Sequence, residues 1–403
     1  MDTAILQIPA STPFSIHKGT SPDSLRALPP NSIDHIITDP PYGLTDKEID
    51  IRKVIQAFLN GDDFRPNGGG YNNNEWDAFV PGPKMWTEAY RILKPGGYLI
   101  AFSGKRTIHY LSLAVQMSGF EIKDQLLWFH GQGNPKTPRL SGTLQEAGAN
   151  ERILNLFGNY RGDLRPLYEP ILIAPKPISA PNIARNLIKH GVGGINSAEI
   201  MPESYAGDII SSLEVKEIFN GKESGIKTIP PVLSFSKASQ REKKNGLNNL
   251  IIPGATDKRP ENTSFANQTP INGFNFHPTV KPIELMKYLI ELFSIKGSII
   301  LDPFMGSGTT GVAALKANRQ FMGTEMDEKY FAIAKHRIEM TSREINSNPI
   351  STANNLKRLF QDNPYINLMG ELELKINNST ATINEFRKFD ELLRKFGPVS
   401  KAA

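Results

Sequence analysis

Residues 299–311 have the sequence IILDPFMGSGTTG, in which a short apolar run is followed by a glycine turn and the start of a helix. Gly306, Gly308 and Gly311 fit the pattern G-x-G-x-x-G, and Glu325 ends the next apolar run. Glycine lets the backbone approach a ligand closely, and a carboxylate after the second strand can hold both hydroxyls of a ribose. The stretch therefore predicts a Rossmann-like strand–loop–helix unit.

Four interpretations of this loop compete. A nicotinamide dinucleotide site fits the glycines. A P-loop for ATP lacks its lysine, because no Gly-Lys-Ser or Gly-Lys-Thr follows. S-adenosylmethionine is the third, since Asp302-Pro303 places a carboxylate and a kinked backbone at the strand end, which suits an amino-acid tail and a sulfonium better than a pyrophosphate. A structural turn without a ligand is the fourth.

Around this loop, apolar runs alternate with amphipathic segments, which predicts βαβ units and an α/β sheet with helices on both faces. The predicted strands are 32–38, 98–102, 125–129, 170–174, 297–301 and 320–324, and the predicted helices are 84–93, 283–293, 309–317 and a helix capped by Asp327 that runs to about 340.

A second acidic turn, Asp39-Pro40-Pro41-Tyr42, follows the strand predicted at 32–38. An exocyclic amino nitrogen is a poor nucleophile because its lone pair is delocalised into the ring. The Asp39 carboxylate and the Pro40 carbonyl can accept its two hydrogens, and neither proline offers a competing amide hydrogen. Tyr42 can stack on the base. A plain strand-ending turn with an aspartate cap is the structural alternative.

Composition narrows the chemistry. The chain has 403 residues, no cysteine, a formal net charge of +5 and a pI of about 9.1. The lack of cysteine excludes disulfides, thiolate metal sites and the cysteine nucleophile that methylation of cytosine C5 needs. The histidines show no metal-ligand spacing, so no metal is predicted. The charge is compatible with a polyanionic partner but equally with an ordinary basic protein. Without a signal peptide or a long apolar run, we expect a cytoplasmic protein.

The two motifs together resemble the amino-methylating DNA methyltransferases, and their order resembles the circularly permuted β group. The resemblance implies a Rossmann-like S-adenosylmethionine-dependent fold with a seven-stranded mixed sheet, and methylation of a flipped-out base in double-stranded DNA. An aspartate first in the catalytic motif is typical of adenine N6 methylation, whereas cytosine N4 enzymes more often begin with serine. A DNA-binding protein that keeps the fold without catalysis is the rival of another class.

Further segments carry the resemblance, namely 93–97, 168–171, 191–196 and 277–282. The family often has Gly-Asp before its first helix, where this chain has Gly19-Thr20. The implied catalytic residues are Asp39, Pro40, Pro41 and Tyr42. The implied cofactor-binding residues are Thr20, Thr279, Lys281, Asp302, Pro303, Phe304, Gly306, Ser307, Gly308, Thr309 and Glu325.

We divide the chain into a catalytic part at 1–180, a target-recognition region at 181–275, a second catalytic part at 276–343 and a C-terminal extension at 344–403. Basic side chains recur between 216 and 261, where a nucleic-acid surface and an ordinary surface loop are equal alternatives. We expect a mobile loop at 68–74 and phosphate contacts from Lys136 and Arg139. A homodimer and a cognate restriction endonuclease are further partners that the resemblance suggests.

Overall fold

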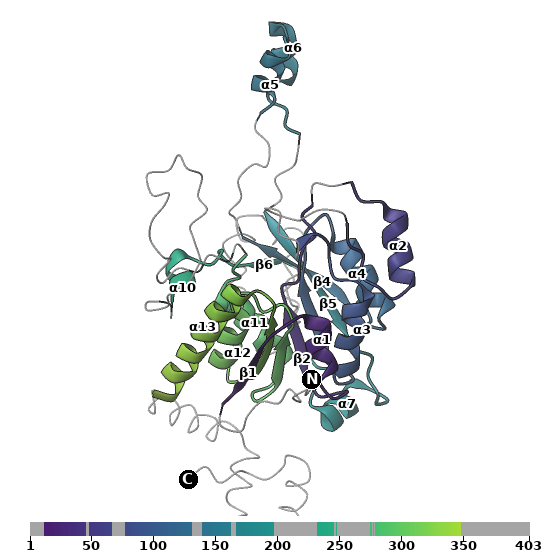
Figure 1. Ribbon diagram of the computed structural model, residues 1–403, viewed down its shortest axis with the longest axis vertical. Coiled ribbons are helices and arrows are strands. Elements are labelled where there is room, and N and C mark those ends of the chain that lie inside the picture. Colours follow the sequence, from purple (N-terminus) through teal and green to yellow (C-terminus); the bar gives the residue numbers. More distant parts are fainter. Residues whose placement is uncertain are drawn as a thin grey trace, which may run out of the picture. The chain divides into compact units, whose positions relative to one another are not determined.

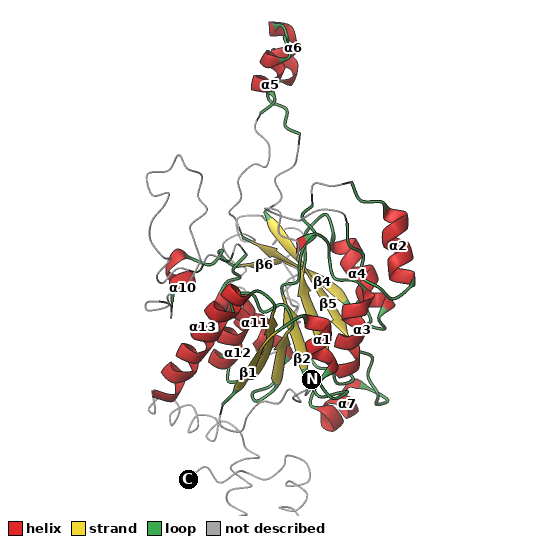
Figure 2. Cartoon of the chain, in the orientation of Figure 1, coloured by secondary structure: helices red, strands yellow, loops and turns green. Residues whose placement is uncertain are grey.

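Eight strands form one mixed sheet in the computed structural model, which describes residues 12–45, 48–66, 77–130, 139–162, 167–196, 232–245, 247, 275, 277 and 279–347 (Figures 1 and 2). The strands are β1 (Phe14–Lys18), β2 (His35–Thr38), β3 (Tyr98–Phe102), β4 (Asp124–Phe129), β5 (Tyr168–Pro175), β6 (Val232–Ser234), β7 (Ile299–Asp302) and β8 (Gln320–Glu325). The Rossmann-like mixed sheet is confirmed, and β6 belongs to a sheet of eight strands, one more than expected.

The strand order is β1-β8-β7-β2-β3-β5-β4-β6. Strands β1, β8, β7, β2 and β3 run parallel, whereas β5 pairs antiparallel with both β3 and β4, and β6 runs parallel to β4. Every residue of β2 and β3 is buried. Parallel strands covered on both faces tend to have continuous apolar runs, as β3 does, and β2 adds the buried polar residues His35 and Thr38 at its two ends.

Helices cover both faces of this sheet (Figure 1). Leu99 and Ala101 of β3 share a core cluster with Trp86 of α3 and Leu111 of α4, while Tyr98 of β3 packs against Phe293 of α11 on the other face. The helices are α1 (Ser21–Arg26), α2 (Ile51–Leu59), α3 (Pro83–Ile92), α4 (Ile108–Met117), α5 (Ser141–Glu146), α6 (Glu151–Phe157), α7 (Ile183–His190), α10 (Gln240–Lys244), α11 (Ile283–Phe293), α12 (Thr309–Lys316) and α13 (Glu328–Ser347).

The topology changes direction between β2 and β7. These strands are neighbours in the sheet although more than 260 residues separate them in the sequence, and β3 lies on the other side of β2. Ligands of open α/β sheets bind at such a switch point, outside the carboxyl ends of the strands. The turn after β2 is Asp39-Pro40-Pro41 and the turn after β7 is the glycine loop, so the fold brings the two motifs together.

All predicted strands and helices that lie in the described residues are present, with ends shifted by a few residues. The sequence did not predict strands β1 and β6 or helices α2, α4, α5, α6, α7 and α10. Within the described part of the chain, no helix is long and apolar enough to cross a membrane. The predicted loop at 68–74, Lys136, most of the recognition region and nearly all of the C-terminal extension lie outside the described residues.

Candidate active site

A cavity of about 770 Å³ lies at the switch point, and both motifs line it. This volume is in the range of pockets that enclose a cofactor-sized ligand. Every predicted catalytic and cofactor-binding residue lies on its wall except Gly308. Gly308, at φ +81°, instead precedes helix α12, where a Cβ would meet the Cα of Ala334 at 2.9 Å. The fold therefore assembles in one cavity the residues that the sequence places far apart.

The glycine loop is shaped by a close approach at Gly306. Its φ is +52°, and a Cβ there would lie 2.8 Å from Nε2 of His277. The amide of Gly306 donates to Oε2 of Glu325 at 2.8 Å. Arg337 of α13 supports the loop from beneath, donating to the Ser307 carbonyl oxygen at 2.6 Å. The loop therefore leaves a space beside Gly306 that a side chain at this position would fill.

Asp302 is a buried carboxylate that holds the loop together. Its Oδ1 accepts from Thr38 at 2.7 Å and from the amide of Phe304 at 3.0 Å, and its Oδ2 accepts from Thr310 at 2.5 Å. Burial raises the pKa of Asp302 to about 6, although these donors oppose the shift. Asp302 joins the ends of β2 and β7 to the start of α12.

Glu325 ends β8 and lies beside the glycine loop on the wall of the same cavity. Besides Gly306, its carboxylate accepts from the amide of Asp327 at 2.8 Å. Burial raises its pKa to about 7 despite the two amide donors. A ligand that supplies hydroxyl donors or positive charge would stabilise the ionised form of this buried carboxyl group.

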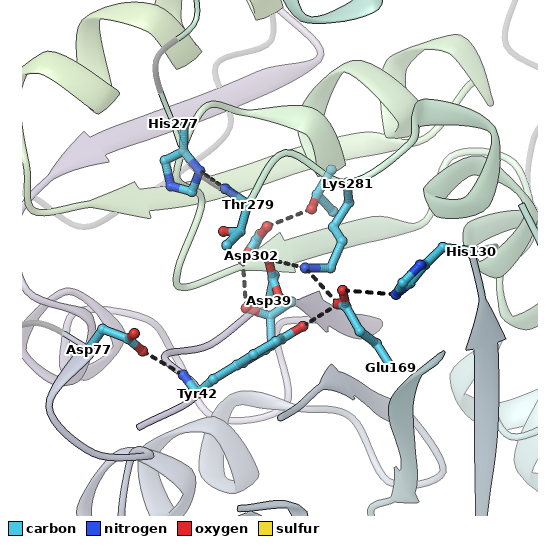
Figure 3. A network of polar contacts seen from close by, with 11 residues as sticks. Asp39, Tyr42, Asp77, His130, Glu169, His277, Thr279, Lys281 and Asp302 are labelled. Carbon is cyan, nitrogen blue, oxygen red and sulfur yellow. Dashed lines mark hydrogen bonds and ion pairs between the residues drawn. The ribbon is translucent and has the colours of Figure 1, made fainter. Parts of the chain in front are cut away.

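Asp39 directly follows β2, and its two carboxylate oxygens differ in their hydrogen-bond partners (Figure 3). Oδ2 accepts from the ammonium of Lys281 at 2.6 Å. Oδ1 is buried, and among the described residues it has no hydrogen-bond partner. Burial raises the pKa of Asp39, and the ammonium of Lys281 opposes this shift. A buried acceptor without a donor is costly, so Oδ1 is suited to a donor that arrives with a ligand.

Lys281 lies between two carboxylates. Its Nζ is 3.4 Å from Oε2 of Glu169 on β5, and the Tyr42 hydroxyl donates to the same oxygen at 2.8 Å (Figure 3). Burial disfavours the ammonium, but Asp39 and Glu169 outweigh it and raise the pKa of Lys281. One ammonium faces two carboxylates, so the group carries a net negative charge.

The backbone around Tyr42 is fixed by side chains from other elements. Asp77 accepts from the Tyr42 amide at 2.8 Å and from the Gly43 amide at 3.2 Å, while Thr107 donates to the Tyr42 carbonyl oxygen at 2.6 Å. The position of Asp77 was not predicted, because nothing in its local sequence marks a contact with the catalytic turn. Glu169 does lie in the segment 168–171 that carried the resemblance, and its role in the site is a structural finding.

Thr20 lines the cavity beside Ser21, which donates to the carbonyl oxygen of Pro303. The Thr20 hydroxyl donates to Oδ2 of Asp23 at 2.5 Å, so an acidic side chain is present three residues beyond the position where the family often has aspartate. Arg139, the described member of the predicted phosphate contacts, is exposed just before α5.

Comparison with known proteins identifies the family to which the chain belongs. A family model described as DNA methylase (N6_N4_Mtase) matches residues 33–336, which include both motifs. The chain belongs to this DNA methylase family. Family membership confirms the predicted DNA methyltransferase class and S-adenosylmethionine as the cofactor.

Individual relatives agree with the family. The type II methyltransferase M.HindIII of Haemophilus influenzae is 29% identical over 340 residues, which cover 80% of this chain and 94% of the relative. The DNA adenine methyltransferase YhdJ of Escherichia coli is 22% identical over 81% of this chain and 83% of its own length. The solved structure of the M1.HpyAVI–SAM complex is 20% identical, with a TM-score of 0.42 over 81% of this chain and 98% of that chain.

Proposed function

We propose that this DNA methyltransferase transfers a methyl group to the N6 amino group of adenine in a base flipped out of double-stranded DNA. The observation that carries the proposal is Oδ1 of Asp39, a buried oxygen that has no donor among the described residues and belongs to a side chain that lines the same cavity as the glycine loop. A primary amino group supplies the missing donor.

In this proposal the target amino group donates one hydrogen to Oδ1 of Asp39 and the other to the Pro40 carbonyl. Both contacts draw the nitrogen toward a tetrahedral form whose lone pair is available. The sulfonium of S-adenosylmethionine supplies an electrophilic methyl group. Transfer would form the N–C bond as the S–C bond breaks, leave the neutral thioether of S-adenosylhomocysteine, and pass one proton from the amino nitrogen to Oδ1 of Asp39. The enzyme contributes mainly by positioning, together with the negative charge that Asp39 and Glu169 retain beside Lys281.

The cofactor residues that we propose follow from the same cavity. Glu325 has the position to accept from ribose hydroxyls, and Gly306 lets the backbone approach the ligand without a Cβ. Asp302 adds negative charge near a cationic ligand while it holds the loop. These carboxylate acceptors fit the hydroxyl and ammonium donors of an adenosyl-amino acid. Pro303, Phe304, Ser307, Thr309, Thr279 and Thr20 complete the proposed binding site.

Two supports favour adenine over cytosine. The catalytic motif begins with aspartate, which resembles the adenine enzymes, and the relative YhdJ is named a DNA adenine methyltransferase. We further propose that residues 181–275 read the DNA sequence. M.HindIII and M.HpaI are named type II methyltransferases, which supports a partnership with a cognate restriction endonuclease. The proposed homodimer rests on the resemblance alone, and the proposed cytoplasmic location rests on the sequence, which has no apolar run of membrane-spanning length.

Modification-sensitive sequencing of DNA from cells that express this chain tests the proposal, with cells that express Asp39→Ala as the control. We expect N6-methyladenine at one short recognition sequence in the first culture and none in the second. N4-methylcytosine without N6-methyladenine would refute adenine as the target.

A further inference from the structure

Lys281 carries a positive charge whose burial needs explanation. Only 5% of its side chain is exposed, and its Nζ contacts Oδ2 of Asp39 at 2.6 Å and Oε2 of Glu169 at 3.4 Å. An ammonium is costly to bury unless it is paired, and the two carboxylates supply that pairing. The charge lies against the catalytic carboxylate, so its first consequence falls on Asp39.

The ion pair makes the two oxygens of Asp39 unequal. Lysine is a donor only, so its contact occupies Oδ2 and leaves Oδ1 as the oxygen that a ligand can use. The pairing also limits rotation of the carboxylate, because turning it would exchange a charge-assisted hydrogen bond for an unsatisfied oxygen. Lys281 therefore determines which oxygen of Asp39 serves the substrate.

A second set of contacts fixes Lys281 itself. Glu169 accepts from Tyr42 at 2.8 Å, and it joins the stacking ring to the ammonium. The ammonium also lies 5.2 Å from the ring centroid of Tyr42, 5.1 Å from that of Phe102 and 5.9 Å from that of Trp128. Cation–π attraction from three rings adds to the restraint. The acceptor and the stacking platform are thus linked through one lysine.

We propose that Lys281 is a positioning residue for methyl transfer, which orients Asp39 through Oδ2 so that Oδ1 meets the target amino group, and that Glu169 anchors Lys281 for this task. The proposal deepens the proposed function and rests on it. It differs from the cofactor-binding role expected from the resemblance, because the contacts of the ammonium are with the catalytic turn.

The ionisable groups around Lys281 determine how its removal changes the pKa of Asp39. The groups that face it from the packed elements are Asp39, Tyr42, Glu169, His277 and, through Glu169, His130 and Lys237. Of these, Asp39 is the carboxylate that the chemistry needs ionised, and the ammonium opposes its neutralisation by burial. Without Lys281 the pKa of Asp39 rises further. The methyl-transfer rate falls at low pH because Asp39 becomes protonated, and this fall is the acid limb of the pH–rate profile. In a variant without Lys281 the acid limb therefore lies at higher pH.

The test compares Lys281→Met with Lys296→Met, an exposed lysine that precedes β7 at the amino end of the sheet, away from the cavity. S-adenosylmethionine affinity is measured by calorimetry, and single-turnover methyl transfer is measured with saturating cofactor and DNA across pH. For Lys281→Met we expect unchanged cofactor affinity, a rate about 100-fold lower and an acid limb shifted to higher pH. Lys296→Met should match the wild type in all three.

Four outcomes would contradict either the positioning role or the proposed function. Methyl transfer by Lys281→Met at the wild-type rate overturns the positioning role, and so does a variant that loses cofactor affinity but keeps the rate at saturation. No transfer by the wild type itself refutes the proposed function instead. Lys281→Arg covers the case in which methionine prevents folding, because a guanidinium can still donate to Asp39. It should recover part of the rate with an acid limb near that of the wild type, and an arginine variant as slow as Lys281→Met, with the same shifted limb, overturns the proposal.

Discussion

Two aspartates at the ends of neighbouring parallel strands begin similar turns yet serve different purposes. Asp302 ends β7, and both of its oxygens are occupied, Oδ1 by Thr38 and the Phe304 amide and Oδ2 by Thr310. Asp39 follows β2, and it has one oxygen on Lys281 and one without a partner among the described residues. Both oxygens of Asp302 hold the glycine loop in place, whereas Oδ1 of Asp39 remains available to accept a hydrogen bond from a substrate.

This difference distinguishes a structural acidic residue from a reactive one where the sequence does not. Both residues precede proline, and burial raises the pKa of each, although Asp302 is buried and Asp39 is half-buried. The count of satisfied oxygens is what separates them. Substitution of Asp39 should therefore affect methyl transfer, and substitution of Asp302 should affect stability and cofactor binding.

The largest effect is expected for Asp39→Asn. An amide keeps the size of the side chain but places a donor where an acceptor or the Lys281 ion pair is needed. We expect methyl transfer to fall about 10³-fold, while the affinity for S-adenosylmethionine stays unchanged. Single-turnover rates and calorimetry check this. A variant that loses cofactor affinity to the same extent would show that Asp39 acts in binding.

Asp302→Asn should give the reverse pattern. The amide group can no longer accept from all three donors, and an unsatisfied buried donor costs about 1–3 kcal/mol. We expect a lower unfolding temperature and weaker cofactor binding, with methyl transfer restored largely by saturating cofactor. Thermal unfolding with and without cofactor measures both. A variant with wild-type stability and affinity but no transfer would contradict the division of roles.

Gly306→Ala tests the space that the glycine loop leaves beside Gly306. The alanine must adopt a left-handed φ, which costs about 1–2 kcal/mol, and its Cβ would lie 2.8 Å from Nε2 of His277. The control is Gly297→Ala, where φ is +83° but no atom lies within 4 Å of a Cβ. We expect both variants to lose folding stability, Gly306→Ala more because of its contact with His277, and cofactor affinity to fall only in Gly306→Ala. Equal cofactor affinities would mean that the loop leaves room for a side chain.

The smallest effect concerns pH. In the free protein the pKa of Glu325 is about 7 and that of Asp302 about 6. A ligand that brings hydroxyl donors or positive charge favours the ionised forms, so binding releases protons. Cofactor affinity should therefore fall as pH decreases below about 7. Calorimetry in buffers of different ionisation enthalpy measures the proton release, and Glu325→Gln should reduce it. Proton uptake on binding would contradict this assignment.

The sequence predicted well the parts of the fold where one face or both faces of an element are apolar. The strand at 98–102 and the helix at 283–293 were predicted with the bounds that the structure has for β3 and α11. Strand β1 was missed because it lies at the edge of the sheet and carries polar residues such as His17 and Lys18. Propensity gives little signal for such a strand, since its pairing with β8 is a tertiary matter.

The site was predicted as two motifs, and their shared cavity follows from the strand order. The contact between Lys281 and Asp39 joins residues 242 positions apart, and no periodicity links them. It exists because β2 and β7 are neighbours and the segment before α11 crosses their ends. The only local signal was the place of Lys281 in the segment 277–282, which pointed to the cofactor instead.

The most direct test of this account is the product that purified protein forms on duplex DNA. Wild type and Asp39→Asn are each given labelled S-adenosylmethionine and DNA containing the recognition sequence, and the digested nucleosides are separated. The account predicts label in N6-methyldeoxyadenosine from the wild type and about 10³-fold less from Asp39→Asn in the same time, with both proteins binding the cofactor equally. Label in N4-methyldeoxycytidine, or equal labelling by the two proteins, would contradict it.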